Sequence, residues 1–467
     1  MKKIKVAYIG GGSKAWARVF MNDLALQKKI KGEIALYDTD LEAAYMNQKF
    51  GERINEAPNT KTKWKYKVYE KIEPALKNAD FVVISILPGT FKEMQSDVHA
   101  CEKYGSYQTV GDTVGVGGVL RAMRTVPIYE FFAKKIKQCC PEAWVLNFTN
   151  PMTILVKTLY DVFPEIKAIG CCHEVFNAQD FLLKVVKEEL GEDADRQEIS
   201  TDVIGVNHFT WITKASYKNH DLFKLLPSFI DKFYDEGYNQ KADGVAGDKK
   251  YLIEPGLYNN KVKMDLFNRY GILGGAGDRH LVEFVNAAWY MKNPEYARNE
   301  WKFNLTPVSF RINRQQKQIK YREDVVNGLI PVEVTQSREE AIEIMQALLG
   351  LGDFKSNVNV PNVGQMQGYP LGAVVETNAF FEQDRITPMV ASPAPIGVQS
   401  LINTHILNQE NLYQGIKNRD LKQIFEVFVC QPLNDNLDLE TSRKLFKEMI
   451  DNTQKYLVEY FDLNQEF

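Results

Sequence analysis

The chain has 467 residues, of which 45% are hydrophobic and 25% are charged, and its formal net charge is −3. This length exceeds that of an average single domain, so we expect two lobes with ample core. Charges are nearly balanced and form no long basic or acidic block, which argues against binding to nucleic acid or to an anionic membrane surface. The apolar runs are too short to span a bilayer, and six cysteines without a secreted disulfide spacing favour a reduced, cytoplasmic protein.

The first predicted unit is a strand, a glycine-rich turn and a helix. An apolar run over residues 4–9 precedes the turn, a helix-like stretch over residues 16–27 follows it, and the turn consists of Gly10, Gly11, Gly12 and Ser13. Glycines let the backbone approach a pyrophosphate closely. The N–H groups at the start of the following helix then bind its negative charge. A second apolar run ends in Asp38, whose carboxylate would accept hydrogen bonds from both ribose hydroxyls and would repel a 2′-phosphate. This order predicts NAD binding, and a simple connecting turn is the alternative.

Strand and helix patterns alternate over the first part of the chain. Short apolar, β-rich runs recur at residues 5–9, 33–37, 81–87, 144–148, 166–170 and 202–206. This alternation predicts an α/β fold with a doubly wound, Rossmann-type parallel sheet and ligands at the carboxyl ends of its strands. Long helical stretches at residues 338–349 and 401–429 mix with loops further on. We therefore expect an NAD-binding domain over residues 1–200 and an α+β lobe for substrate, metal and oligomerisation over residues 201–467.

Three segments after predicted strands carry groups suited to chemistry. Cys172 and His173 follow one strand, and His208 follows another. One thiolate and one imidazole are too few for a structural zinc site, but they suit a catalytic divalent metal with open coordination positions. The alternative is that Cys172 and His208 are only packed or hydrogen-bonded side chains. In the third segment, residues 145–151, Asn150 offers an amide for sugar hydroxyls or a nicotinamide, and an Asx-type turn before Pro151 is the alternative.

These dispersed motifs together resemble glycoside hydrolase family 4, the NAD- and metal-dependent glycosidases, over nearly the whole chain. The motifs lie at residues 9–13, 111–118, 147–151, 170–174, 205–208 and 277–280. The resemblance implies a malate or lactate dehydrogenase-like N-terminal fold and a reaction unlike that of the two-carboxylate glycosidases. In that reaction the sugar is oxidised at C3 by NAD, deprotonated at C2 beside the metal, cleaved by elimination, hydrated, and reduced again.

The resemblance also implies roles for individual residues. Cys172 and His208 match metal-binding positions, for Mn²⁺ or another divalent metal, and His173 matches the position that assists the leaving oxygen. We therefore expect His173 to be the general acid, with simple substrate binding as the alternative. The C2 base is a tyrosine in some members and a carboxylate in others, within residues 258–283. We expect Asp278, then His280 or Tyr270, unless these groups only fix a loop.

The remaining expected contacts follow from the same motifs. The NAD contacts are Gly10, Gly11, Gly12, Ser13, Asp38 and Pro88, and the substrate contacts are Asp112, Asn150, Glu174, Arg279 and His280. The sequence His173-Glu174-Val175 after Cys172 differs from that of relatives acting on 6-phosphorylated sugars and resembles the subgroup acting on α-galacturonides.

The carboxylate of such a uronic acid glycoside requires a cation. Arg279 suits a planar, bidentate pair better than Lys14, although an ordinary ion pair is the alternative for Arg279. Glu174 would repel the carboxylate and is expected to orient His173 or a cation.

Other functions stay open at this point. Within the family they are α-galactosidase and α-glucosidase activity. From other classes they are a malate- or lactate-type 2-hydroxyacid dehydrogenase and a non-catalytic NAD-binding regulator. The resemblance further implies a homo-oligomer, either a dimer or a tetramer.

Overall fold

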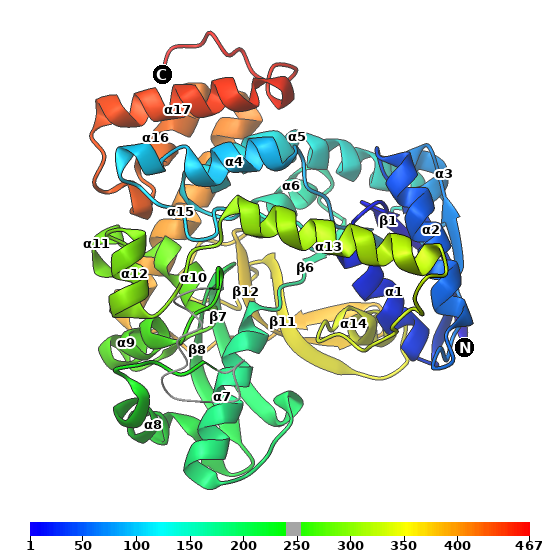
Figure 1. Cartoon of the computed structure of the whole chain (residues 1–467), viewed down its shortest axis with the longest axis horizontal. Coiled ribbons are helices and arrows are strands. Elements are labelled where there is room, and N and C mark those ends of the chain that lie inside the picture. Colours follow the sequence, from blue (N-terminus) through cyan, green and yellow to red (C-terminus); the bar gives the residue numbers. More distant parts are fainter. Residues whose placement is uncertain (240–253) are drawn as a thin grey trace.

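The computed structural model describes residues 1–239 and 254–467, and its N-terminal part is built on a parallel sheet (Figure 1). The strands of this part follow the order β3-β2-β1-β4-β5-β6. Their bounds are β1 (Lys2–Ile9), β2 (Ile30–Tyr37), β3 (Lys65–Val68), β4 (Phe81–Ile84), β5 (Trp144–Asn147) and β6 (Lys167–Gly170). All neighbouring pairs within this order are parallel. This is the doubly wound order of dinucleotide-binding folds, so the predicted fold class is confirmed.

Helices cover both faces of this sheet, which explains its apolar strands. The helices of this part of the chain are α1 (Trp16–Leu26), α2 (Leu41–Glu56), α3 (Ile72–Leu76), α4 (Phe91–His99), α5 (Gly115–Cys139), α6 (Met152–Val162) and α7 (Glu174–Leu190). Of these, α1, α2, α3, α5 and α6 supply buried side chains to the two hydrophobic clusters that line the sheet. Along β4, Val82 and Ile84 face one hydrophobic cluster, whereas Phe81 and Val83 face the other. A strand covered on both sides needs apolar residues at every position, as β4 has.

Three strands from the C-terminal half extend the same sheet beyond β6. They are β11 (Phe354–Pro361), β12 (Val374–Glu382) and β13 (Arg385–Pro388), and the order continues β6-β11-β12-β13 with antiparallel pairing. Asn359 of β11 pairs with Gly170 of β6. This return was not predictable from the sequence, because strand pairing between distant segments leaves no local signal.

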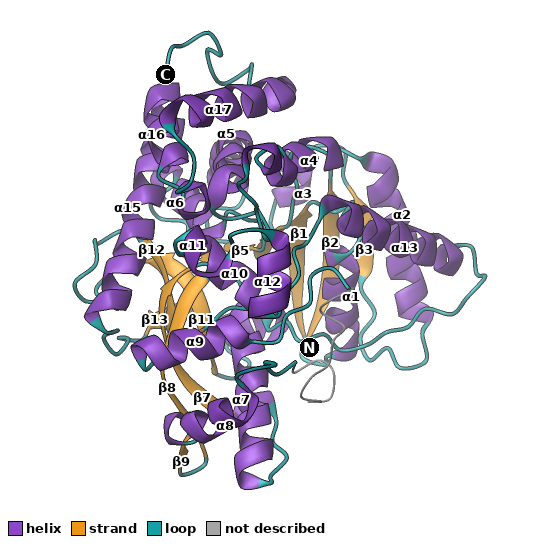
Figure 2. Cartoon of the chain, turned by 60° about the vertical axis from the view of Figure 1, so that its left-hand side comes forward, coloured by secondary structure: helices purple, strands orange, loops and turns teal. Residues whose placement is uncertain are grey.

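A second sheet corrects one expectation. The predicted strand at residues 202–206 lies in β7 (Ile199–Val206), which pairs antiparallel with β8 (Phe209–Tyr217), not in the parallel sheet. Only Asn207 and His208 separate the two strands, and a two-residue link forms a hairpin, whereas a parallel pair needs a long crossover. The sheet also holds β9 (His220–Asp221) and β10 (Leu273–Gly274), and β7, β8 and β9 lie apart from β1, β2 and β3 in Figure 2.

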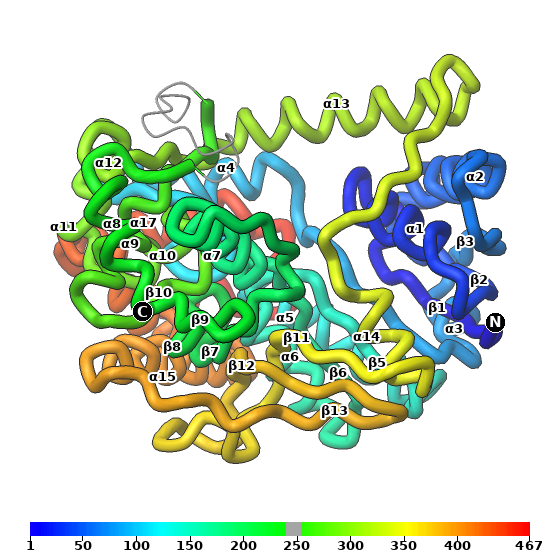
Figure 3. The backbone as a smooth tube through the Cα atoms, turned by 90° about the horizontal axis from the view of Figure 1, so that it is seen from below, coloured from blue at the N-terminus to red at the C-terminus, as the bar shows by residue number. Residues whose placement is uncertain are grey.

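Among the described residues, the C-terminal half also contains a series of α-helices. They are α8 (Leu226–Phe233), α9 (Lys261–Tyr270), α10 (Asp278–Leu281), α11 (Ala287–Tyr290), α12 (Pro294–Trp301), α13 (Val308–Val326), α14 (Ala341–Leu348), α15 (Ile396–Asn418), α16 (Leu421–Val429) and α17 (Leu439–Thr453). The helical stretch expected at residues 401–429 is divided at Arg419, which has a left-handed φ of 58°. Helix α13 runs from α4 to α2, a path that Figure 3 follows. Among the described residues, no helix is long and apolar enough to cross a membrane.

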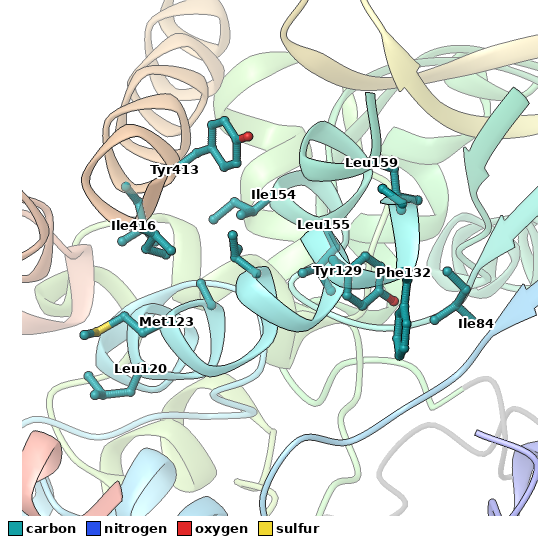
Figure 4. Packing of buried hydrophobic residues seen from close by; sticks show 14 of the residues in the cluster. Ile84, Leu120, Met123, Tyr129, Phe132, Ile154, Leu155, Leu159, Tyr413 and Ile416 are labelled. Carbon is teal, nitrogen blue, oxygen red and sulfur yellow. The ribbon is translucent and has the colours of Figure 1, made fainter. Parts of the chain in front are cut away.

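Helix α5 lies at the centre of the largest hydrophobic cluster (Figure 4). Its buried side chains pack against those of α6 and α15, and the labelled residues include Leu120, Met123, Tyr129, Ile154, Leu155 and Ile416. Each fully buried large apolar side chain contributes about 1.5–3 kcal/mol relative to exposure. The packing fixes the start of α5, where the loop carrying Asp112 enters the site.

Candidate active site

The glycine turn after β1 is held against the ends of two neighbouring strands. The N–H groups of Gly10 and Gly11 both donate to the carbonyl oxygen of Tyr37 at 2.9 Å. Gly10 has a φ of 95°, and a Cβ atom there would lie 2.0 Å from the carbonyl oxygen of Ser85, so only glycine fits. The N–H of Gly12 donates to Oδ2 of Asp38 at 2.7 Å, which fixes the predicted ribose-binding carboxylate beside the turn.

The loops after β4 and β5 complete this edge of the sheet. Pro88 is buried in the first loop, and the N–H of Ile86 in the same loop donates to Oγ1 of Thr149 at 3.0 Å. The Tyr129 hydroxyl donates to Oδ1 of Asn147 at 2.5 Å, so α5 holds the end of β5 in place. Oδ1 of Asn150 is buried and has no hydrogen-bond partner among the described residues. It is therefore an acceptor available to a ligand.

A possible metal site lies where three distant segments meet. The ligand atoms of Asp112, His208 and His280 all lie within 4.8 Å of one another. Asp112 precedes α5, His208 lies in the β7–β8 turn and His280 lies on α10. The two imidazole rings are 4.3 Å apart, centroid to centroid. A carboxylate and two imidazoles suit a divalent transition metal. Asp112 and His280, expected as substrate contacts, are thus grouped with the expected metal ligand His208.

The protonation of this group is compatible with metal binding. Burial, reinforced by the charge of His280, lowers the pKa of His208 to about 3, so its ring is neutral at physiological pH. Burial disfavours ionisation of Asp112, but interactions with His208, which is charged only in acid, and with His280 and two arginines keep the pKa of Asp112 well below the usual range. The Thr113 hydroxyl donates to Oδ1 of Asp112 at 2.8 Å and lies 3.0 Å from Nδ1 of His208. Nδ1 of His280 is buried without a partner among the described residues.

Cys172, the other expected metal ligand, lies beside this group without being part of it. Interaction with the side chain of Asn207, the residue before His208, favours its thiolate and lowers the pKa of the thiol. Burial raises the pKa of the Cys172 thiol well above its ordinary value, and the charges of Glu376 and Glu174 add to this effect. A bound cation reverses such a shift, because it stabilises the thiolate that coordinates it. The role of Cys172 as a ligand stays a prediction.

His173 and Glu174 lie between two parts of the site. One is the predicted nucleotide edge, formed by the glycine turn after β1 and the start of α1. The other is the metal group, which consists of Asp112, His208 and His280. The His173 ring lies 5.7 Å from the ring of Trp16, the first residue of α1. Its Nδ1 lies 3.2 Å from Glu339. Burial lowers the pKa of His173, but the hydrogen bond and charge of Glu339 prevail and raise it above its ordinary value.

Glu174 links the two histidines on either side of it. Its Oε2 accepts the N–H of Gly277 at 2.9 Å, and its Oε1 lies 3.9 Å from Nε2 of both His173 and His280. Burial disfavours its charged form, but the charges of His280 and His173 keep its pKa well below the usual range.

Asp278, the expected C2 base, is fully buried, with 0% of its surface exposed. Its carboxylate accepts the N–H groups of Val262 and Lys263, in the first turn of α9, at 3.3 and 3.1 Å. Burial raises its pKa to about 6. Both oxygens of Asp278 thus contribute to the start of α9, and its catalytic role stays a prediction.

Arg279, expected to bind the substrate carboxylate, is half-buried beside Tyr258. Its Nη1 donates to the hydroxyl of Thr306, and its guanidinium lies 5.6 Å from the centre of the Tyr258 ring. The Tyr258 hydroxyl is buried and has no partner among the described residues. Lys14, the weaker candidate, is instead paired with Asp40 at 2.6 Å.

Sequence reasoning assigned no role to two groups that shape the Asp112 loop. Oε1 of Glu283 accepts the N–H groups of Thr109, Val110 and Gly111 at 3.0, 2.8 and 2.9 Å. Nη2 of Arg311 donates to the carbonyl oxygen of Val110 at 2.6 Å. A glutamate that binds a loop far away in sequence has no distinctive local pattern, so only the fold reveals this contact.

The chain is similar to known proteins over nearly its whole length. An α-galacturonidase of Thermoanaerobacter italicus is 49% identical over 454 residues, which are 97% of this chain and 97% of that protein. The crystal structure of Bacillus subtilis lplD, described as a glucosidase, has a TM-score of 0.89 at 42% identity and covers 96% of this chain and 100% of its own. A 6-phospho-α-glucosidase from gut microorganisms, solved with NAD and Mn²⁺, shares the fold with a TM-score of 0.82 at 18% identity, covering 97% and 99%.

The family assignment follows from matches to both halves of the chain. The model described as family 4 glycosyl hydrolase matches residues 5–188. The model of the C-terminal domain of the same family matches residues 203–434. Together with the 49% identity to a relative of nearly the same length, these matches show that the chain belongs to the family 4 glycosyl hydrolases.

Proposed function

We propose that the chain hydrolyses α-galacturonides with bound NAD and a bound divalent metal, for which Mn²⁺ is the first candidate. The observation that carries the proposal is a chain of side-chain contacts from the nucleotide edge to the metal group. Trp16 packs on His173, Glu174 lies between His173 and His280, and the His280 ring packs on His208. A sugar bound along this path would meet the cofactor, an acid and the metal at once. The relative from Thermoanaerobacter italicus supports the choice of substrate.

The residues of the chain have distinct roles in this proposal. When bound, NAD and the metal supply reversible oxidation at C3 and stabilise negative charge at the neighbouring sugar oxygens. His208 and Cys172 hold the metal, with Asp112 and His280 as further donors within reach. His173 donates a proton to the leaving oxygen, and Glu339 favours its protonated form.

Two residues compete for the role of C2 base. Asp278 is the residue that the sequence favours, but its oxygens already accept two backbone N–H groups. The Tyr258 hydroxyl has no hydrogen-bond partner in the described part of the chain, which supports Tyr258 as a second candidate. We propose to distinguish them by incorporation of solvent deuterium at C2 of the product. The variant that abolishes this exchange, Asp278→Asn or Tyr258→Phe, identifies the base, provided that NAD and Mn²⁺ still bind.

Arg279 is proposed to bind the substrate carboxylate. A site built for a carboxylate leaves a guanidinium unmatched when a neutral sugar binds, which costs on the order of 2–4 kcal/mol. That energy corresponds to a preference of roughly 30- to 1000-fold. Arg279→Ala should reduce this preference more than it lowers turnover of the neutral sugar. Arg385→Ala, at an exposed ion pair on β13, is the matched control.

The test compares kcat/KM for p-nitrophenyl α-galacturonide and p-nitrophenyl α-galactoside. We expect cleavage to require NAD⁺, Mn²⁺ and a thiol reductant together, without net accumulation of NADH. Equal constants for the two sugars, or a preference for the galactoside or an α-glucoside, would assign the chain to the neutral-sugar enzymes of the family. Net NADH formation from a 2-hydroxyacid would instead support the dehydrogenase alternative, which the family assignment does not favour.

We also propose that the chain forms a homo-oligomer. Several large apolar side chains of the C-terminal half are exposed, with exposed fractions of 75% for Val363, 77% for Leu371 and 83% for Ile396. Exposed apolar groups of this kind favour association when they lie on one surface. Light scattering coupled to gel filtration is expected to give the mass of a dimer or tetramer, and a mass of 53.5 kDa would contradict this proposal.

A further inference from the structure

A buried carboxyl group, that of Glu376, lies between two segments that carry proposed metal ligands. Glu376 is on β12 and is 1% exposed. One of the two segments is the loop after β6, which carries Cys172. The other is the β7–β8 turn, which carries His208. Glu376 belongs to neither segment, and none of the roles assigned above involves it as a ligand.

On one side, Glu376 is linked to the Cys172 loop through Asn357 of β11. Nδ2 of Asn357 donates to Oε1 of Glu376 at 2.5 Å and to the carbonyl oxygen of Cys172 at 3.2 Å. The pairing of Asn359 with Gly170 holds β11 against the end of β6. The backbone position of Cys172 therefore depends on an amide that Glu376 orients.

On the other side, Glu376 is linked directly to the turn of His208. Nδ2 of Asn207 donates to Oε2 of Glu376 at 3.3 Å. A second hydrogen bond joins β12 to the hairpin that carries His208. In it, the N–H of Val203 on β7 donates to Oδ1 of Asn378 on β12 at 2.9 Å. The two oxygens of Glu376 thus reach the two ligand-bearing segments separately.

Burial of a carboxyl group at this position has an energetic cost that an apolar residue would avoid. The bidentate contact instead supplies a fixed spacing between segments from two different sheets. We propose that Glu376 is a positioning residue that sets the relative placement of Cys172 and His208 and thereby the affinity for a divalent metal. The inference rests on the proposed function in so far as Cys172 and His208 hold the metal. Residues that orient metal ligands typically change affinity by roughly 10- to 100-fold when replaced.

The experiment measures Mn²⁺ binding to the full chain by the electron paramagnetic resonance signal of free Mn²⁺. Glu376→Gln turns one oxygen into a donor that faces an asparagine N–H, so one of the two links is lost. We expect roughly 10- to 100-fold weaker Mn²⁺ binding, unchanged NAD affinity and Tm, and recovery of kcat at high Mn²⁺. Asn357→Ser, which removes the link to the Cys172 loop, should give the same selective loss. Glu382→Gln, on the exposed end of β12, is the control and should match the wild type.

Three results would overturn the inference. The first is an unchanged Mn²⁺ affinity in Glu376→Gln and Asn357→Ser. The second is a parallel decrease in NAD affinity and Tm that excess Mn²⁺ does not reverse. The third is failure of both variants to fold. The last two would make Glu376 a purely structural residue. If the wild type itself binds no Mn²⁺, the proposed function fails, and that outcome is distinct from the three above.

Discussion

Replacing Glu283 should loosen the loop that presents Asp112. The carboxylate of Glu283 is fully buried on the segment after α10, and its Oε1 accepts three consecutive backbone N–H groups, those of Thr109, Val110 and Gly111. Glu283→Ala leaves these donors unsatisfied in a buried place. Asp112 follows them directly, so its position in the metal group depends on this contact.

The magnitude follows from the three hydrogen bonds. Each bond to a charged acceptor is worth about 1.5–3 kcal/mol, and three donors that share one oxygen contribute less than their sum. We expect Glu283→Ala to lower the free energy of unfolding by about 3–5 kcal/mol. Glu283→Gln keeps an oxygen acceptor of the same shape and should cost about 1–2 kcal/mol, because the charge is lost and the geometry is kept.

The assay combines thermal unfolding with hydrogen exchange of the loop amides. In Glu283→Ala, the amides of residues 109–111 should exchange faster than those of β4, and Mn²⁺ binding should weaken. In Glu283→Gln, most of the protection should remain. If Glu283→Ala keeps the wild-type Tm and amide protection, the three hydrogen bonds do not hold the loop and the reasoning is refuted.

Three further predictions concern the metal ligands, the glycine turn and a buried lysine. Cys172→Ser and His208→Ala should each abolish activity and Mn²⁺ binding while leaving NAD binding largely intact, and a Cys172→Ser variant with normal metal content would exclude Cys172 as a ligand. Gly10→Ala should abolish NAD binding or folding because its Cβ would lie 2.0 Å from the Ser85 oxygen, whereas Gly191→Ala, with a φ of 70° and open space, should lose only about 1–2 kcal/mol. Burial lowers the pKa of Lys263 to about 8, so the folded protein binds fewer protons than the unfolded chain between pH 8 and 10.5. The wild type should gain about 3 kcal/mol of stability across this range, as measured by denaturant unfolding, relative to Lys263→Met.

The sequence by itself determined the parallel part of the fold and the nucleotide edge. The reason is that their signals are local: β4 is apolar at every position because helices cover both faces, and the glycine turn lies directly between a strand and a helix. The family resemblance rests on motifs of the same kind, short segments whose residues act close to one another. For these features, the residues that act together are also close together in the sequence.

Only the tertiary structure decided how the site is assembled. The grouping of Asp112 with His208 and His280, the hairpin that carries His208, and the return of β11 and β12 to the first sheet join segments far apart in the chain. Such contacts depend on how whole sheets and helices pack, and a single side chain has the same local pattern whether or not a distant partner meets it. Glu283 and Glu376 lie in segments that support the family resemblance but had no role of their own in the sequence, and burial beside loops from other elements gives them their roles.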